Sequence, residues 1–413
     1  MIVLCPDCDE AQTLPTLLPL RHAFCHRCHA ELARTATPGI RTEALLAAVV
    51  TALFLYIPAT FLPILVVEYN SQIRENIVAT GAASLVQQGY WSLGALVFLL
   101  TVVLPLLWLI ALLVVVSALT QDYRPPWLGS VLRIADGLRP WAMPEVFLLG
   151  GFVAYSRVEA LAATSIGSGG WAYMFYGAAV LAIDLLYDRR ALWEQVMPTP
   201  SVVNLQEAFA CHTCQFPLEP DTGPPESPVI CPRCGTHTCR RKEDSFHHCA
   251  ALVATAAILY IPANLLPVMT VEQLGVRTPN TIISGIGELW DDGVWPLAII
   301  VFFASLAVPL LKLLGLSWCL AMISHRSGSQ VMNRTRLARF IRLIGRWSNI
   351  DVFTISILCV LGDFGTLEQV EVDPGAVAFA SVVILTMIAS HRFDPRLMWD
   401  AASDEPASET AKS

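Results

Sequence analysis

The sequence predicts an all-α polytopic membrane protein, with eight transmembrane helices arranged as two parallel tandem four-helix repeats. Three observations support this fold class. Hydrophobic residues make up 55% of the 413 residues, only 15% are charged, and the mean hydropathy is +0.56, far from the values of soluble domains. A proline-containing apolar motif occurs twice. Two CxxC pairs precede each copy, so each repeat begins with a small cysteine-rich module.

Eight apolar runs are long enough to cross a bilayer as helices. They cover residues 43–67, 91–119, 145–163, 172–187, 249–271, 294–323, 351–367 and 374–391. The chain opens on Cys5-Pro-Asp-Cys8 and not on the basic and apolar regions of a cleavable signal peptide, so we expect the first span to direct insertion.

Basic residues are concentrated on one side of these spans. The loops after spans two, four and six are rich in arginine, whereas the opposite loops hold only Arg74 and Arg277 together with several acids. By the positive-inside rule, both termini and both cysteine-rich modules are predicted to be cytoplasmic. The net charge of −8 and the lack of a basic face argue against a nucleic-acid partner.

The repeat has an almost constant offset. YIPATFLPIL, from Tyr56 to Leu65, returns 204 residues later as YIPANLLPVM, and matches in the second half of each unit follow at an offset of 206. Because four spans are an even number, both copies have the same orientation in the membrane, as in transporters with parallel repeats. The predicted domains are a cysteine module at 1–41, helices at 42–200, a second module at 201–248, helices at 249–399, and a disordered polar tail at 400–413.

The cysteine modules carry the most specific local pattern. In each module two CxxC pairs are separated by the same sixteen residues, which suits a tetrahedral site with four thiolates and no open position. We therefore predict two structural zinc ribbons, with iron in a rubredoxin-like site as the less favoured metal. Disulfides are disfavoured in a reducing cytoplasm, and a redox dithiol is the remaining alternative. The predicted ligands are Cys5, Cys8, Cys25, Cys28, Cys211, Cys214, Cys231 and Cys234.

One position distinguishes the second copy from the first. Lys312 stands where the first copy has Trp108, close to the middle of span six. A lysine at that depth costs about 2.5–3.5 kcal/mol on insertion scales, so it is expected to face a protein interior and to mark a functional site. Ser305 lies seven residues earlier on the same helical face.

Several polar residues are candidate partners for Lys312 in a polar intramembrane cluster. They are Asp184, Thr386, Ser348 and Asp351. Two of these have a simpler interpretation, because Asp184 is near the cytoplasmic edge of its span and Asp351 is an acid at a helix N-terminus. Arg157 and Asp363 occupy equivalent positions of the two copies and are predicted as a possible ion pair across the repeat interface; outward snorkelling of Arg157 is the alternative.

These motifs resemble the paraquat-inducible protein A family (PqiA/LetA), which includes the inner-membrane component of the lipophilic envelope-spanning tunnel system. The resemblance rests on the duplicated CxxC modules, the YIPANLLP, TIISGI and PLLK segments, and IGRWSNIDVF ending at Phe353. It covers the chain from Cys5 to Trp399.

The resemblance implies a multi-pass protein of the bacterial inner membrane that works with an MCE-domain tunnel protein. In that picture the chain loads or unloads phospholipid beneath the tunnel and so supports outer-membrane lipid homeostasis. The four-helix units would be similar to those of tetraspanins and claudins, with small strands from outer loops 67–89 and 271–292. The family's polar intramembrane cluster would map onto Lys312, Ser305, Ser348, Asp184 and Thr386.

Two other functions remain open. The CxxC pairs could serve a membrane thiol or quinone oxidoreductase, or the chain could be a non-transporting anchor for the tunnel protein. The sequence contains no GxxxxGK[ST] loop, so ATP is not expected to drive this chain directly. We expect a transport component and not an enzyme.

Overall fold

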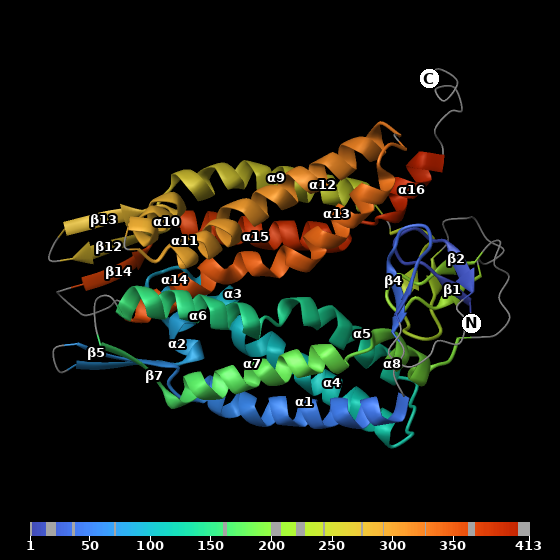
Figure 1. Cartoon of the computed structure of the whole chain (residues 1–413), viewed down its shortest axis with the longest axis horizontal. Helices are drawn as coiled ribbons and strands as arrows, with labels where there is room; N and C mark the ends of the chain where they lie inside the picture. The colour runs from blue at the N-terminus through green and yellow to red at the C-terminus, as the bar shows by residue number, and fades with distance from the viewer. Residues whose placement is uncertain are drawn as a thin grey trace.

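The computed structural model describes residues 2–13, 22–34, 38–69, 72–159, 163–199, 208–219, 228–242, 244–273, 276–291, 293–326, 328–361 and 368–403. Two groups of long helices, one from each half of the chain, lie alongside each other (Figure 1). The cysteine-rich modules are at one end of the helices, and two small β-sheets are at the other.

The first half contains a helical unit that runs from α1 to α8. Its elements are α1 (Pro38–Phe61), β5 (Leu65–Tyr69), β6 (Gln72–Asn76), α2 (Val78–Gln87), α3 (Trp91–Phe98), the π-helix η1 (Leu99–Val103), α4 (Leu104–Thr120), α5 (Leu128–Leu138), the 3-10 helix η2 (Arg139–Trp141), α6 (Pro144–Glu159), β7 (Ala163–Ile166), α7 (Ser168–Leu186) and α8 (Arg189–Val196).

The second half repeats this order of elements. They are α9 (Ser245–Leu265), β12 (Met269–Gln273), β13 (Val276–Asn280), α10 (Ile282–Asp291), α11 (Trp295–Val301), the π-helix η3 (Phe302–Ala307), α12 (Val308–Ser324), α13 (Val331–Ile344), the 3-10 helix η4 (Gly345–Asn349), α14 (Ile350–Leu361), β14 (Glu368–Val372), α15 (Pro374–Arg392) and α16 (Arg396–Ser403).

Each cysteine-rich module consists of two β-hairpins. Ribbon 1, as we call the first module, contains β1 (Ile2–Leu4) with β2 (Ala11–Thr13) and β3 (His22–Phe24) with β4 (Glu31–Arg34). Ribbon 2 contains β8 (Phe209–Ala210) with β9 (Pro217–Leu218) and β10 (Val229–Ile230) with β11 (His237–Thr238).

Seven helical runs in the described part of the chain are long and apolar enough to cross a membrane. They are Arg41–Phe61, Trp91–Thr120, Ser168–Leu186, Ser245–Leu265, Trp295–Ser324, Val331–Val360 and Pro374–Arg392. The eighth predicted run, 145–163, corresponds to α6, which has 16 residues and ends at Glu159. It is shorter than predicted because the chain enters strand β7 at Ala163.

The strands are a correction to the all-α prediction. The predicted span 43–67 ends early, because α1 stops at Phe61 and residues from Leu65 onward form a strand. Each outer sheet is antiparallel, in the order β6-β5-β7 or β13-β12-β14. The resemblance implied strands in the outer loops 67–89 and 271–292, but β7 and β14 come from a different loop of each half. In each half, the third strand lies between the third and fourth long helices in sequence and pairs with the strand that follows the first long helix. It therefore connects the second pair of helices of the unit to the first pair.

Other boundaries also differ from the prediction. The helical run Val331–Val360 begins well before the predicted span 351–367, since α13, η4 and α14 follow one another without a break. Residues 362–367 and 404–413 lie outside the described residues, so the end of that span and most of the predicted tail are not described. Helix α16 continues to Ser403, into the segment that was predicted to be tail.

A π-helix precedes the proline of the second long span in both halves. Pro105 and Pro309 lack the N–H of a regular helical turn, and a π-turn accommodates a proline without a steric clash. The tyrosine of the repeated motif donates to a carbonyl of the π-turn in each half: Tyr56 Oη to Val102 O at 2.7 Å, and Tyr260 Oη to Leu306 O at 3.4 Å. The motif therefore connects the first long helix of each unit to the second.

The two helical units meet at α14, which packs against α6 and α2 of the first unit. Glycines allow the close approach: a Cβ at Gly81 would lie 2.6 Å from Ser356 O, and one at Gly150 would lie 3.1 Å from Ile350 O. Thr354 Oγ1 donates to Gly150 O at 3.2 Å. The backbones of the two units thus come into close contact at these glycines, which leaves little room for side chains to move at the interface.

The ribbons dock in a crossed arrangement. In ribbon 1, Asp7 accepts hydrogen bonds from Arg339 and Arg342 of α13, which belongs to the second unit. In ribbon 2, Thr236 accepts from Arg133 of α5, and a Cβ at Gly129 of α5 would overlap Arg233 O, so the contact with the first unit is tight. Each ribbon therefore contacts the helical unit of the opposite half, in addition to its own half, where Arg190 donates to Leu32 O at 2.9 Å and Arg396 donates to Ala210 O at 3.4 Å.

Candidate functional site

Lys312 is buried in the second unit without an acidic partner. Its side chain, on α12, is 0% exposed. The ammonium donates to Gly345 O at 2.8 Å and lies 3.4 Å from Thr386 Oγ1. No acid among the described residues forms an ion pair with it. Two neutral acceptors replace only part of the hydration that a buried ammonium loses, so this charge can attract an anion.

Other predicted cluster residues lie on elements that pack around Lys312. Ser305 is on η3, and Ser348 is on η4, next to α12 and α15. Both side chains are 1% exposed, and neither hydroxyl makes a hydrogen bond of normal geometry with the described residues. Buried hydroxyls usually have a partner, so the Ser348 hydroxyl leaves a donor available inside the second unit, whereas the Ser305 hydroxyl is close to the Asp351 carboxyl.

Asp351 lies beyond this cluster, toward the first unit. Its carboxyl is close to the Ser305 hydroxyl and to the Arg157 guanidinium. Asp351 and Arg157 also line a small, mainly apolar cavity of about 40 Å³ at the contact between the two units. The structure therefore groups Asp351 with Ser305 and Arg157 and not with the Lys312 ammonium.

Asp184 has a partner in its own half of the chain. Its carboxylate, on α7, receives two hydrogen bonds from the Arg139 guanidinium, one of them from Nε at 2.8 Å. Arg139 also lies over the Trp108 ring at 5.0 Å and is 3.6 Å from Glu145. Asp184 was predicted as a candidate partner of Lys312, and the structure pairs it with Arg139 instead.

Arg139 is a residue that the sequence reasoning counted only as a sign of orientation. It begins η2, at the position equivalent to Gly345 in the second half. Its neighbour Trp108 is equivalent to Lys312. The first copy thus has its basic residue at the start of the 3-10 helix, and the second copy has it in the long span. An alignment of the two copies at offsets of 204 and 206 would have revealed this exchange.

Arg157 crosses between the halves, but with a different contact from the one predicted. Its Nη2 donates to Gly285 O at 3.0 Å, which joins α6 of the first unit to α10 of the second. Asp363, its predicted ion-pair partner, lies outside the described residues. A connection between the repeats through Arg157 is thus present, and its partners are a backbone carbonyl and the nearby Asp351.

The eight predicted metal ligands form two buried groups of four cysteines. Within each group the sulfur atoms lie within 4.8 Å of one another. Across the two hairpins the Sγ atoms are 3.4 Å apart for Cys5 and Cys28 and 3.6 Å for Cys8 and Cys25, and ribbon 2 has the same pair of values. A tetrahedron with metal–sulfur bonds of about 2.3 Å has edges of about 3.8 Å, so both groups fit a tetrahedral metal ion.

The backbone of the hairpins is shaped to hold these sulfurs. The residue after the second cysteine of each pair has a positive φ: Asp9 at 60°, His29 at 54°, Gln215 at 60° and Gly235 at 67°. In ribbon 1, Gln12 Nε2 donates to Cys25 Sγ at 2.8 Å, an outer-shell contact of the kind that orients a metal ligand. His212, close to ribbon 2, instead bonds Cys239 O at 2.9 Å, and burial lowers the pKa of its imidazole.

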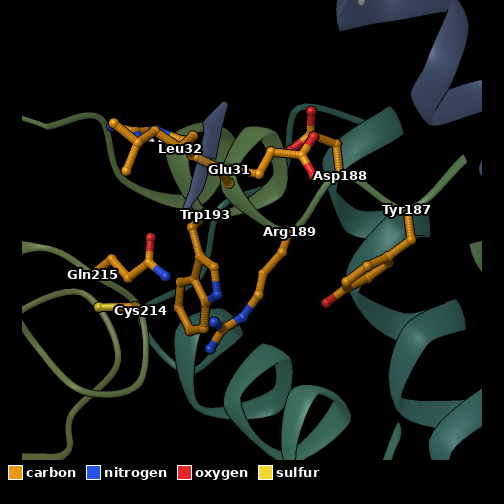
Figure 2. Close-up of a pocket in the computed structure, with 9 residues that line it drawn as sticks. Glu31, Leu32, Tyr187, Asp188, Arg189, Trp193, Cys214 and Gln215 are labelled. Atoms are coloured by element: carbon orange, nitrogen blue, oxygen red, sulfur yellow. Dashed lines mark hydrogen bonds between the residues drawn. The ribbon is translucent and has the colours of Figure 1, made fainter. Parts of the chain in front are cut away.

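A second cavity lies between both ribbons and the end of α7 (Figure 2). It measures about 230 Å³ and is lined by Glu31 and Leu32 of ribbon 1, Cys214 and Gln215 of ribbon 2, and Tyr187, Asp188, Arg189, Arg190 and Trp193. Asp136 accepts hydrogen bonds from Tyr187, Arg189 and Trp193. Burial and the Asp136 carboxylate raise the pKa of the Tyr187 hydroxyl, so it remains a neutral donor.

Comparison with known proteins places the chain in a family. The model of the family described as paraquat-inducible protein A matches residues 42–197 and 246–403. The chain belongs to the paraquat-inducible protein A family. The two matched segments coincide with the two helical units, while the ribbons lie outside them.

Curated relatives of the family cover nearly the whole chain. The intermembrane transport protein PqiA of Escherichia coli is 31% identical over 420 residues, covering 100% of this chain and 98% of the relative. The lipophilic envelope-spanning tunnel protein A of the same species is 31% identical, covering 96% and 91%. A probable intermembrane transport protein of Haemophilus influenzae is 26% identical, covering 96% and 95%. No solved structure is significantly similar to the chain.

Proposed function

We propose that this chain is the inner-membrane component of a system that moves phospholipid between membranes, and that it loads or unloads a periplasm-spanning tunnel formed by an MCE-domain protein. Two relatives named as intermembrane transport proteins and one named as a tunnel protein support a role in such a system. Their names describe transport proteins, which favours this role over that of an enzyme.

The observation that carries the proposal is the buried ammonium of Lys312. A phospholipid phosphate would supply the anion that the protein does not supply, and a charge-assisted hydrogen bond is about twice as strong as a neutral one. The Ser348 hydroxyl is the neighbouring donor for a headgroup, with Ser305 close to it in the same unit. The Thr386 hydroxyl donates to Val383 O and accepts from Lys312, so it would help to hold the ammonium in place. Acyl chains would remain in the surrounding apolar region. Ionisable groups within a membrane span often mark such pathways.

The same proposal includes the arrangement in the membrane. Each half forms a four-helix unit similar to those of tetraspanins and claudins, and α6 together with α5 makes the eighth crossing. Both ribbons and both termini face the cytoplasm, where the arginine-rich segments lie, and the two sheets face the periplasmic partner. Ribbons that dock on opposite halves would then brace the two units from the cytoplasmic side.

Zinc is the proposed metal in both ribbons. All eight ligand cysteines are buried, and each group of four leaves no open position, which fits a structural site better than a reactive thiol pair. Metal analysis of the purified chain should give about two zinc ions per chain. Iron in equal amount would assign a rubredoxin-like site, and metal-free, readily titrated thiols would favour an oxidoreductase.

The experiment that tests transport is complementation in a strain that lacks this system and has an envelope defect. Lys312→Ala is compared with Leu314→Ala, which changes an exposed side chain on the same helix. Expression and pull-down of the MCE-domain partner are measured for both variants. We expect Lys312→Ala to lose complementation while it still binds the partner, and Leu314→Ala to complement.

Complementation by Lys312→Ala at the level of the unmodified chain would overturn the proposed site. The chain would then be a non-transporting anchor for the tunnel protein, and Lys312 would have a structural role alone.

A further inference from the structure

The 3-10 helix η4 holds the carbonyl that receives Lys312. Gly345 is its first residue, and its carbonyl oxygen is 2.8 Å from Lys312 Nζ. A 3-10 turn has poorer hydrogen-bond geometry than an α-helix, so its position depends strongly on contacts with its surroundings. A shift of about 1 Å would break the contact, because a hydrogen bond weakens steeply beyond normal length.

One external contact comes from the first helical unit. Arg346, the residue after Gly345, donates through Nη1 to Glu145 Oε1 of α6 at 2.7 Å. The Glu145 side chain is only 14% exposed, so this ion pair is shielded from solvent more than a surface pair. Glu145 is also 3.6 Å from Arg139, which holds Asp184. A line of alternating charges thus leads from α7 through Glu145 to η4.

A second external contact comes from ribbon 1. Asp7 Oδ1 accepts from Arg342 at 3.0 Å, and Asp7 Oδ2 accepts from Arg339 at 2.8 Å. The Asp7 side chain is 7% exposed. Both arginines are in the last two turns of α13, which runs directly into η4, so the Asp7 contact is close to Gly345 along the helix.

The contact between Lys312 and a backbone carbonyl distinguishes the second copy from the first. Gly345 is equivalent to Arg139, which carries its own charge in the first copy, whereas η4 offers only its carbonyl to Lys312. In the second unit the position of the Lys312 ammonium therefore depends on η4. Glu145 and Asp7, which lie outside that unit, contact η4 and the helix before it.

We propose that Glu145 and Asp7 are positioning residues for the Lys312 site: through Arg346 and Arg342 they hold η4 so that the Gly345 carbonyl meets the ammonium. The consequence for phospholipid transport rests on the proposed function, whereas the positioning itself can be measured on the protein alone.

The composition of the chain allows a direct readout. The sequence contains three lysines, at positions 242, 312 and 412. Full-length protein labelled with carbon-13 lysine therefore gives a simple NMR spectrum in detergent, and the signal of Lys312 is the one that disappears in Lys312→Arg. Its chemical shift reports the surroundings of this ammonium and does not require transport.

The variants are Glu145→Gln, Arg346→Gln and the double variant. The matched control is Arg277→Gln, which breaks an exposed pair with Glu272 of the same 2.7 Å length in the β12–β13 hairpin. We expect both single variants to shift the Lys312 signal, the double variant to shift it no further than the larger single effect, and the control to leave it unchanged. Asp7→Asn tests the second contact and is expected to shift the same signal.

A Lys312 signal that stays in place in Glu145→Gln and Arg346→Gln would overturn the positioning role. So would a double variant whose shift equals the sum of two separate effects, because each residue would then act independently of the ion pair.

Transport is the second measurement. We expect Glu145→Gln and Arg346→Gln each to reduce complementation by about tenfold or more, as for a lost hydrogen bond to a charged group. If both shift the signal while Lys312→Ala still complements, the positioning stands and the proposed function fails. If Lys312→Ala abolishes complementation while neither variant shifts the signal, the proposed function stands and the positioning fails.

Discussion

The two helical units place a cation beside their 3-10 helix by opposite means. In the first unit the cation is Arg139, at the start of the 3-10 helix, and it stacks on Trp108 of the neighbouring span. In the second unit the cation is Lys312, at the position equivalent to Trp108, and it points to Gly345 of the 3-10 helix. The chemical groups have exchanged places between the two elements.

Their compensation also differs. Arg139 is neutralised by Asp184 and lies close to Glu145, so the first site is a closed ion-pair network. Among the described residues, Lys312 has a carbonyl and a hydroxyl as its partners and no carboxylate. A closed network stabilises the fold, whereas an uncompensated charge remains available to a ligand. This difference is what the proposed function requires of a duplicated unit in which one copy is structural and the other binds a ligand.

The largest effect is expected when each cation is removed in turn. Arg139→Met leaves Asp184 without its guanidinium, while Glu145 keeps Arg346, and should lower the free energy of unfolding by about 3 kcal/mol. Lys312→Met removes a charge that has no counter-ion and should leave stability unchanged or raise it. Denaturant unfolding of both variants in the same detergent measures the contrast, and equal losses would contradict the assigned difference.

The crossed ribbons give the next prediction. Cys5→Ser should release one of two metal ions and weaken the contact of Asp7 with α13, so the amides of α13 should exchange hydrogen at least about tenfold faster. Cys211→Ser should have this effect on α5 of the first unit instead. Hydrogen exchange followed by mass spectrometry distinguishes the two. An increase that is larger in the helical unit of the same half as the altered ribbon than in the opposite unit would contradict the crossed contacts.

A smaller effect is expected for Asp184→Asn. The amide keeps one acceptor for Arg139 and Glu145 remains nearby, so we expect a loss of about 1–3 kcal/mol in unfolding free energy. Complementation should fall only as far as the amount of folded protein falls. Loss of complementation at normal protein levels would return Asp184 to the transport site, as the sequence first suggested.

The smallest effect is expected for Thr386→Val, which keeps the shape of the side chain. At 3.4 Å its hydroxyl is a weak partner of Lys312, so transport should decrease by no more than about fivefold, or about 1 kcal/mol. A lipid-transfer assay with the purified chain and its partner measures this. Complete loss would make the hydroxyl and not the ammonium the principal contact for the headgroup.

Sequence by itself determined the features that depend on local pattern. Hydropathy predicted eight spans, seven of which overlap helical runs that are long and apolar enough to cross a membrane, and cysteine spacing identified both groups of four cysteines. The unusual position of Lys312 followed from the comparison of the two copies. These predictions succeed because helix periodicity and hairpin ligand spacing involve residues close together in the chain.

Only the tertiary structure decided which groups meet. The pairing of Asp184 with Arg139, the third strands β7 and β14, and the Gly345 carbonyl as the partner of Lys312 all depend on how separate elements pack. The contacts that hold η4 join residues 201 and 335 positions apart. No local periodicity encodes such distances, because they result from the docking of one half of the molecule, and of one ribbon, on the other half.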